Sequence, residues 1–256
     1  MPSSGWFQTS GLSYWVEELL RSSVWVRSSR ADLFQVDLAA GTVDWQPSQT
    51  RAPFDSARRK NVSRILELFI SPPNPALLLH GCAVGFRQGA ACFLGVSGEG
   101  KSTMGAGFLS KGHPLFSDDV CLIRRNGAGL LLEPGFPAMQ LRPSSARWLA
   151  GTGTRLNLAL AKVSGSGPVP LKTLYLLRRS RHRCPIRVEP VKGREALLAL
   201  TRNTPHLIVR SPEILRRNFQ FTIGLLREVP VKRLTYPTGF RSLPSVCEAV
   251  LRDMNS

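Results

Sequence analysis

Residues 95–102 read Gly-Val-Ser-Gly-Glu-Gly-Lys-Ser and satisfy the pattern G-x-x-x-x-G-K-[S/T]. Glycines let the backbone curl so that successive N–H groups point at phosphate oxygens, and the positive end of a following helix adds to the attraction. Lys101 should reach the β- and γ-phosphates of a nucleotide, and the Ser102 hydroxyl should bind Mg²⁺. The pattern therefore predicts a site for ATP or a related triphosphate. The predicted nucleotide-binding residues are Gly95, Ser97, Gly98, Glu99, Gly100, Lys101, Ser102 and Thr103.

Two adjacent carboxylates, Asp118 and Asp119, follow the loop at a short distance in sequence. One could accept the proton of an acceptor hydroxyl while the other faces the magnesium ion. Paired acids are often only a solvated turn, but their closeness to the phosphate loop favours a functional role. Together the loop and the acids predict phosphoryl transfer.

The elements around the loop are those that a phosphate site needs. An apolar strand over 90–96 runs directly into the loop, and a helix should begin at Lys101 and end near Gly112. A strand over 77–80 precedes them, with a turn expected at 85–89. Asn126-Gly127 predicts a hairpin between strands 120–124 and 129–133. Further strands are expected at 173–177, 187–191 and 231–236, and helices are expected to start at Pro212 and near Pro244.

The region before the loop has a different pattern. Short apolar runs alternate with turns up to about residue 54, which predicts a small strand-rich region. Apolar residues over 56–70 recur at helical spacing, and the proline cluster at 71–75 then ends that helix. We therefore expect two parts, residues 1–75 and residues 76–256. The Gly/Ser-rich stretch 151–170 should be a loop.

Three segments in a fixed order carry a family resemblance. Leu79-His80-Gly81, the loop, and the run from Gly112-His113 to Asp118-Asp119 resemble the core of the HPr kinase/phosphorylase family. The resemblance implies an α/β fold with a P-loop nucleotide-binding domain of the HPr kinase and phosphoenolpyruvate carboxykinase type. It also implies that Asp118 is the catalytic base with His80 beside it, that Lys101 assists, and that Asp119 supports the metal with Ser102. His113 is shared as well and is interpreted as structural.

Looser parts of the resemblance suggest a substrate. Pro134 to Pro137 and Glu228 to Pro237 are similar to short HPr-kinase-like proteins associated with modified-peptide gene clusters, including lasso peptides. This implies an ATP-dependent serine or threonine kinase acting on a peptide or small protein. The family's Glu-Ile-Arg-Gly segment is missing, so phosphorylase activity is not expected. Glu133 is the nearest replacement carboxylate, although a strand-end Glu facing solvent is the favoured interpretation.

Composition restricts the partners. The net charge is +17, from 34 Lys and Arg against 17 Asp and Glu. Arg142, Arg147 and the run 178–183 could hold an acidic or phosphate-bearing partner, or could simply be solvated faces. Nucleic acid is not favoured. HPr kinases assemble into oligomers, and the resemblance extends that expectation to this chain.

Cysteine and histidine usage predicts no structural metal. Five cysteines, none in a C-x-x-C pair, read as buried thiols in a reducing compartment, and the four histidines form no ligand-spaced cluster with them. The chain has no run of eighteen apolar residues and no leader-like N-terminus, so a cytoplasmic location is expected.

Two alternatives stay open. Ser97 to Thr103 and the paired acids are also similar to phosphoenolpyruvate carboxykinase, although no Lys-His-Asp set for Mn²⁺ is evident. The chain could instead be a regulatory module that binds a nucleotide and transfers nothing. Against that alternative, phosphate binding alone requires neither a base nor its partner.

Overall fold

The computed structural model describes residues 6–9, 12–19, 23–28, 33–37, 42–46, 76–118, 120–127, 129–135, 139, 141, 143–152, 167–180, 184–204 and 212–256. Contacts divide the chain into two units. One contains residues 1–76 and 205–218, and the other contains residues 77–204 and 219–256. We call the second the loop-bearing unit. The helix predicted over 56–70 and the boundary predicted at 71–75 lie outside the described residues, and the division into 1–75 and 76–256 stays a prediction.

The N-terminal residues form an antiparallel meander. Among the described residues the strands are β1 Trp6–Thr9, β2 Leu12–Leu19, β3 Ser23–Ser28, β4 Leu33–Asp37 and β5 Thr42–Gln46, each paired with the next. Val26 of β3 lies opposite Phe34 of β4, and both side chains are fully buried. These strands fall in the region where alternating apolar runs predict strands.

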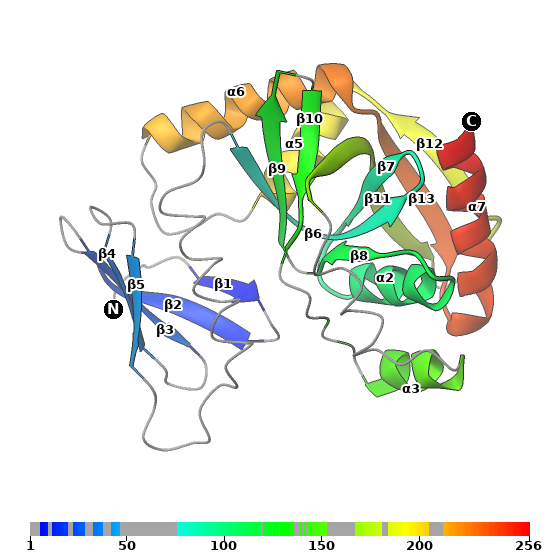
Figure 1. Ribbon diagram of the computed structural model, residues 1–256, viewed down its shortest axis with the longest axis horizontal. Coiled ribbons are helices and arrows are strands. Elements are labelled where there is room, and N and C mark those ends of the chain that lie inside the picture. The colour runs from blue at the N-terminus through cyan, green and yellow to red at the C-terminus, as the bar shows by residue number, and fades with distance from the viewer. Residues whose placement is uncertain are drawn as a thin grey trace. The chain divides into compact units, whose positions relative to one another are not determined.

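The described strands of the loop-bearing unit form one sheet in the order β10-β9-β6-β7-β11-β13-β12, with β8 paired to β6 (Figure 1). Their bounds are β6 Ala76–Phe86, β7 Gly89–Leu94, β8 Leu115–Ser117, β9 Val120–Asn126, β10 Gly129–Glu133, β11 Val169–Ser180, β12 Arg187–Val191 and β13 Val231–Pro237. β7, β11 and β13 are mutually parallel. The carboxyl ends of these three strands therefore meet at one edge, which is where ligands bind in open α/β sheets.

Helices cover both faces of this sheet. The described helices are α2 Lys101–Ser110, α3 Pro143–Gly151, α5 Gly193–Asn203, α6 Pro212–Glu228, the 3₁₀ turn η1 Phe240–Ser242, and α7 Leu243–Asn255. Ala91 and Phe93 of β7 pack in one core with side chains of α2 and α7, while Cys92 packs in a second core with side chains of α5 and α6. The fold is mixed α/β, as predicted. None of the described helices is long and apolar enough to cross a membrane.

β6 is longer than the sequence predicts. The expected strand ends at residue 80 with a turn at 85–89, but β6 continues to Phe86, and only Arg87 and Gln88 form the turn. Its glycines serve close packing instead. A Cβ at Gly81 would lie 2.6 Å from Leu94 Cδ2, and one at Gly85 would lie 2.5 Å from the Phe116 ring. Glycine in a strand interior often marks a site where another group approaches the backbone closely.

α2 is buried on nearly all sides, which explains its small residues. A Cβ at Gly105 would lie 2.5 Å from Cys82 Sγ of β6, and one at Gly107 would lie 3.0 Å from Cys247 Sγ of α7. A helix that is apolar all round is expected where it has packing partners on several sides. α2 is therefore held between the sheet and α7, and its first turn, next to the loop, is held with it.

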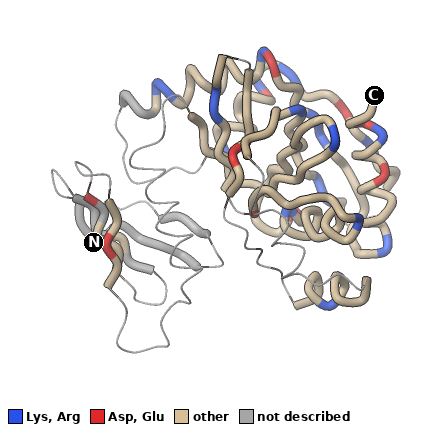
Figure 2. Tube along the Cα trace, in the orientation of Figure 1, with Lys and Arg blue, Asp and Glu red and all other residues tan. Residues whose placement is uncertain are grey.

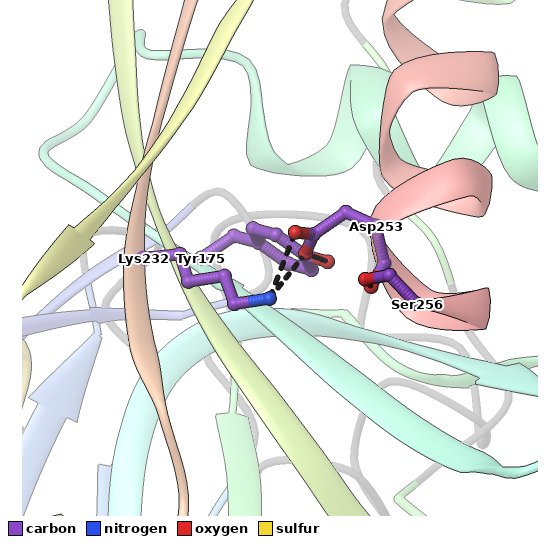
Figure 3. Close-up of polar contacts among 4 residues, drawn as sticks. All are labelled: Tyr175, Lys232, Asp253 and Ser256. Atoms are coloured by element: carbon purple, nitrogen blue, oxygen red, sulfur yellow. Dashed lines mark hydrogen bonds and ion pairs between the residues drawn. The ribbon is translucent and has the colours of Figure 1, made fainter.

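A polar anchor joins α7 to the parallel strands. Asp253 accepts hydrogen bonds from the Tyr175 hydroxyl at 2.5 Å and from Lys232 Nζ at 2.8 Å, as Figure 3 shows. Tyr175 and Lys232 are neighbours in the parallel pairing of β11 with β13, and Tyr175 is fully buried. Burial and the Asp253 carboxylate raise the pKa of Tyr175, so its hydroxyl stays protonated and donates. The anchor fixes the helix that covers α2.

Candidate functional site

The loop at 95–100 leaves the sheet at the carboxyl end of β7 and leads into α2. Leu94, the last residue of β7, pairs with Leu176 of β11, and β11 and β13 continue together past that point. The loop therefore lies beside the last residues of β11, which pair with the last residues of β13. The strand, loop and helix order predicted from the sequence is confirmed.

Two glycines give the loop its curl. Gly98 has φ 92° and Gly100 has φ 97°, both in the left-handed region that favours glycine. A Cβ at Gly98 would meet nothing within 4 Å, so the space beside that residue is open. The N–H of Met104 donates to the Gly100 carbonyl, which starts α2. The N–H groups of the helix's first turn have no acceptor within the helix, and they provide donors for an anion.

Lys101 is folded across the loop. Its ammonium donates to the Gly95 carbonyl at 2.8 Å and to the Val96 carbonyl at 3.3 Å, and the residue is 9% exposed. A buried cation at the loop concentrates positive charge where phosphate oxygens would lie. Ser102 in the first turn is half-buried. The Thr103 hydroxyl shares a hydrogen bond of 3.1 Å with Ser145 Oγ of α3, so this predicted binding residue contacts α3.

Three residues distant in sequence hold the loop, and the sequence predicted a contact with the loop for none of them. Asn203 Oδ1, at the end of α5, accepts from the Gly95 N–H at 3.1 Å. The Arg179 N–H of β11 donates to the Glu99 carboxylate at 2.6 Å, and the Tyr236 hydroxyl of β13 donates to the Glu99 carbonyl. Glu99, a predicted nucleotide-binding residue, thus connects the loop to the adjacent strands.

Local sequence contained few signals for these contacts. α5 itself was not predicted, although Gly193 before an acidic first turn and the buried Ala196 and Leu200 at helical spacing would have indicated it. Tyr236 was noted only as part of a loose resemblance, and its partner is 137 residues away in sequence. Only the parallel pairing of β7, β11 and β13 brings these residues together.

The strand pairings bring His80 and Asp118 to the loop's edge of the sheet. β6 pairs antiparallel with β7 on one side and with β8 on the other, so β7 and β8 run in the same direction and both end beside the middle of β6, opposite Gly81 and Ala83. Gly81 pairs with Leu94, which places His80 beside the start of the loop. Ser117 ends β8 and pairs with Ala83, and Asp118 follows at 9% exposure. His80, the loop and Asp118 therefore share one edge.

Contacts of Ser117, the residue before Asp118, hold this end of β8. The Ser117 hydroxyl donates to the Val120 carbonyl. Gly135, two residues after the end of β10, packs against Ser117: the Gly135 N–H donates to the Phe116 carbonyl at 2.7 Å, and a Cβ on Gly135 would lie 2.7 Å from Ser117 Oγ. The position of Asp118 is thus coupled to the backbone at Gly135, a residue of the Pro134-Gly135 pair in the looser resemblance.

The remaining residues predicted from the sequence either lie outside the described residues or have contacts away from the loop. Asp119, the predicted metal ligand, is outside the described residues, as are Arg142 and residues 181–183. Glu133 does not face solvent freely, because Arg124 Nε binds its carboxylate at 2.7 Å and the side chain is 14% exposed. Within the described ranges no three His, Cys, Asp or Glu side chains group as metal ligands. His113 packs against the rings of Phe86 and Phe108, in keeping with a structural role.

Charge around the loop is positive. Arg178 and Arg179 are exposed at the end of β11, and Figure 2 shows Lys and Arg spread over several elements of the loop-bearing unit. Burial, and then the charge of Glu99, raise the pKa of Tyr236, while Arg179 opposes the shift. The Tyr236 hydroxyl is therefore a hydrogen-bond donor at physiological pH.

Four of the five cysteines are buried and all are free thiols, whereas Cys184 is partly exposed.

Comparison with known proteins gives similarity in structure and none in sequence. No family model and no curated protein matches the chain in sequence. The fold is similar to a structure described as the Hpr(Ser) kinase/phosphatase from Coxiella burnetii, with a TM-score of 0.37 and 11% identity. The match covers 70% of this chain and 95% of the other. At these values the similarity assigns no function to the chain.

Proposed function

We propose that this protein is an ATP-dependent phosphotransferase that phosphorylates a serine or threonine hydroxyl. The observation that carries the proposal is the buried Lys101 ammonium folded over a phosphate loop at the carboxyl end of β7. His80 and Asp118 at the same edge of the sheet support it further. A loop that only bound phosphate would need neither of these two side chains.

The residues present fit a nucleotide polyphosphate. The open space at Gly98 and the donors of the first turn of α2 can receive phosphate oxygens. Lys101 would exchange its bonds to loop carbonyls for bonds to the β- and γ-phosphates. Ser102 and Asp119 would hold Mg²⁺. When bound, the ion would supply positive charge that offsets the charge of the phosphates.

The proposed reaction gives each side chain a role. Asp118 accepts the proton of the acceptor hydroxyl, whose oxygen forms a bond to the γ-phosphorus as the bond to the bridging oxygen breaks and ADP leaves. Lys101 stabilises the charge on the phosphate oxygens. His80 lies beside the loop on the same edge and assists Asp118. The low exposure of Asp118 limits the water that could compete with the acceptor.

The charge around the loop supports a class of substrate. Exposed Arg178 and Arg179 next to the loop, and a net charge of +17, favour an acidic peptide or small protein. A precursor peptide of the lasso type is our specific candidate, and the cytoplasm, where such a peptide and ATP meet, is the proposed location.

Transfer of label from γ-labelled ATP tests the proposal. The wild type should label candidate precursor peptides that contain serine or threonine. Asp118→Asn should lower kcat by on the order of 10²-fold or more while nucleotide binding persists. Glu248→Gln, an exposed carboxylate change on α7, is the control and should match the wild type. If the wild type binds ATP and labels no acceptor, the nucleotide-sensing alternative replaces the kinase.

A further inference from the structure

Glu99 uses all three of its polar groups to hold the loop. Its N–H donates to the Val96 carbonyl at 3.2 Å, its carboxylate accepts from Arg179 N–H, and its carbonyl accepts from the Tyr236 hydroxyl. The following residue, Gly100, has φ 97°. Because glycine adopts both signs of φ, the peptide group between Glu99 and Gly100 has little intrinsic preference for one orientation.

The orientation of that peptide group decides where a phosphate-binding donor points. In a planar trans peptide the carbonyl and the following N–H point in opposite directions. With the Glu99 carbonyl turned to β13, the Gly100 N–H points away from Tyr236. If the peptide flipped, the carbonyl oxygen would replace the N–H on that side and repel a phosphate.

Tyr236 is well placed to prevent this flip. Its ring is 7% exposed in the core beside α2 and α7, and its backbone lies in the ladder with β11, where Tyr236 pairs with Arg179. The hydroxyl is therefore fixed by a rigid strand. A Cβ on Gly100 would lie 2.9 Å from that hydroxyl, which shows how closely the tyrosine approaches the loop.

We propose that Tyr236 is a positioning residue, whose hydroxyl keeps the Glu99–Gly100 peptide oriented so that the Gly100 N–H faces the phosphates. This inference rests on the proposed function in assigning a nucleotide to the loop. The Tyr236 hydroxyl contacts the loop at the Glu99 carbonyl and acts through the Gly100 N–H.

Tyr175 offers a matched control. It is a second buried tyrosine in the same core, and its hydroxyl donates to Asp253 of α7 and not to the loop (Figure 3). Tyr236→Phe and Tyr175→Phe each remove one hydroxyl. Tyr175→Phe loses a hydrogen bond to a carboxylate and should lower stability at least as much as Tyr236→Phe, so a change in loop exchange or affinity seen only in Tyr236→Phe reports the position of that hydroxyl and not a general loss of stability.

Two measurements on the full chain test the inference. The first is hydrogen exchange of the loop amides without ligand. The second is the affinity for Mg·ATP and for inorganic tripolyphosphate, which has no base or ribose. Tyr236→Phe should speed loop exchange and weaken both ligands by about two- to tenfold, the effect of one neutral hydrogen bond. Tyr175→Phe should change neither.

The outcomes separate this inference from the proposed function. Loop exchange and affinities at wild-type values in Tyr236→Phe would overturn the inference, and so would equal changes in both tyrosine variants. If the wild type binds neither ligand but Tyr236→Phe alone speeds loop exchange, the hydroxyl does hold the loop and the proposed function fails.

Discussion

Gly135→Ala should slow phosphoryl transfer without weakening nucleotide binding. The new Cβ would lie 2.7 Å from Ser117 Oγ, 2.9 Å from Ser117 Cβ and 3.1 Å from the Phe116 carbonyl oxygen. Ordinary contact begins near 3.4 Å, so Ser117 or Gly135 must move by about 0.7 Å. Because Ser117 directly precedes Asp118, the displacement reaches the proposed base. A shift of this size should lower kcat on the order of tenfold.

The assay compares kcat, nucleotide affinity and stability in three proteins. Overpacking should cost Gly135→Ala about 1–3 kcal/mol of unfolding free energy, which urea unfolding measures. Gly127→Ala is the control, because a Cβ at that residue would meet nothing within 4 Å. Wild-type kcat in Gly135→Ala, despite the stability loss, would refute the coupling between Gly135 and Asp118. Loss of nucleotide affinity in place of kcat would refute it as well.

Three further predictions concern the packing around α2 and α7. Gly105→Ala, with its Cβ 2.5 Å from Cys82 Sγ, should lower the unfolding free energy by about 1–3 kcal/mol, measured as a lower urea midpoint. Asp253→Ala, which removes the acceptor of the buried Tyr175 hydroxyl, should cost about 2–3 kcal/mol in the same assay, and an unchanged midpoint would contradict the anchor. Burial raises the pKa of Cys247 from 9.0 to about 12, so the unfolded chain loses this proton first. The free energy of unfolding should therefore fall by about 1.4 kcal/mol per pH unit as the pH rises from 9.0 to about 12. Urea titrations at pH 9.5 and 10.5 should show a smaller loss of unfolding free energy between these two pH values in Cys247→Ala than in the wild type.

The local part of the site could be predicted from the sequence. The Gly-Lys-Ser pattern predicts the strand before it and the helix after it, because phosphate binding requires glycine, lysine and a hydroxyl within eight residues. The motif order also indicated His80 and Asp118, and the antiparallel pairing of β6 with β7 and β8 shows the physical reason. Two strands that flank one antiparallel neighbour end at the same edge.

The contacts between distant segments could not be predicted. Nothing near Tyr236, Arg179 or Asn203 in sequence indicates a loop more than 75 residues earlier, because the parallel ladder that joins them depends on the whole sheet. The turn predicted to begin at Gly85 is also wrong. Gly85 lies within β6, where the Phe116 ring packs against it too closely for a Cβ. Glycine's two uses, turning and close packing, look alike in a sequence.

Titration of Mg·ATP into the wild type, Lys101→Ala and Lys111→Ala tests the central claim most directly. Both lysines lie at the ends of α2, but Lys111 is exposed and its ammonium lies 3.6 Å from the Glu248 carboxylate on α7. If the loop binds the polyphosphate, Lys101→Ala should weaken binding about tenfold or more, the value of a charge-assisted hydrogen bond, and Lys111→Ala should bind as the wild type does. Equal affinity in the wild type and Lys101→Ala would contradict nucleotide binding by residues 95–102.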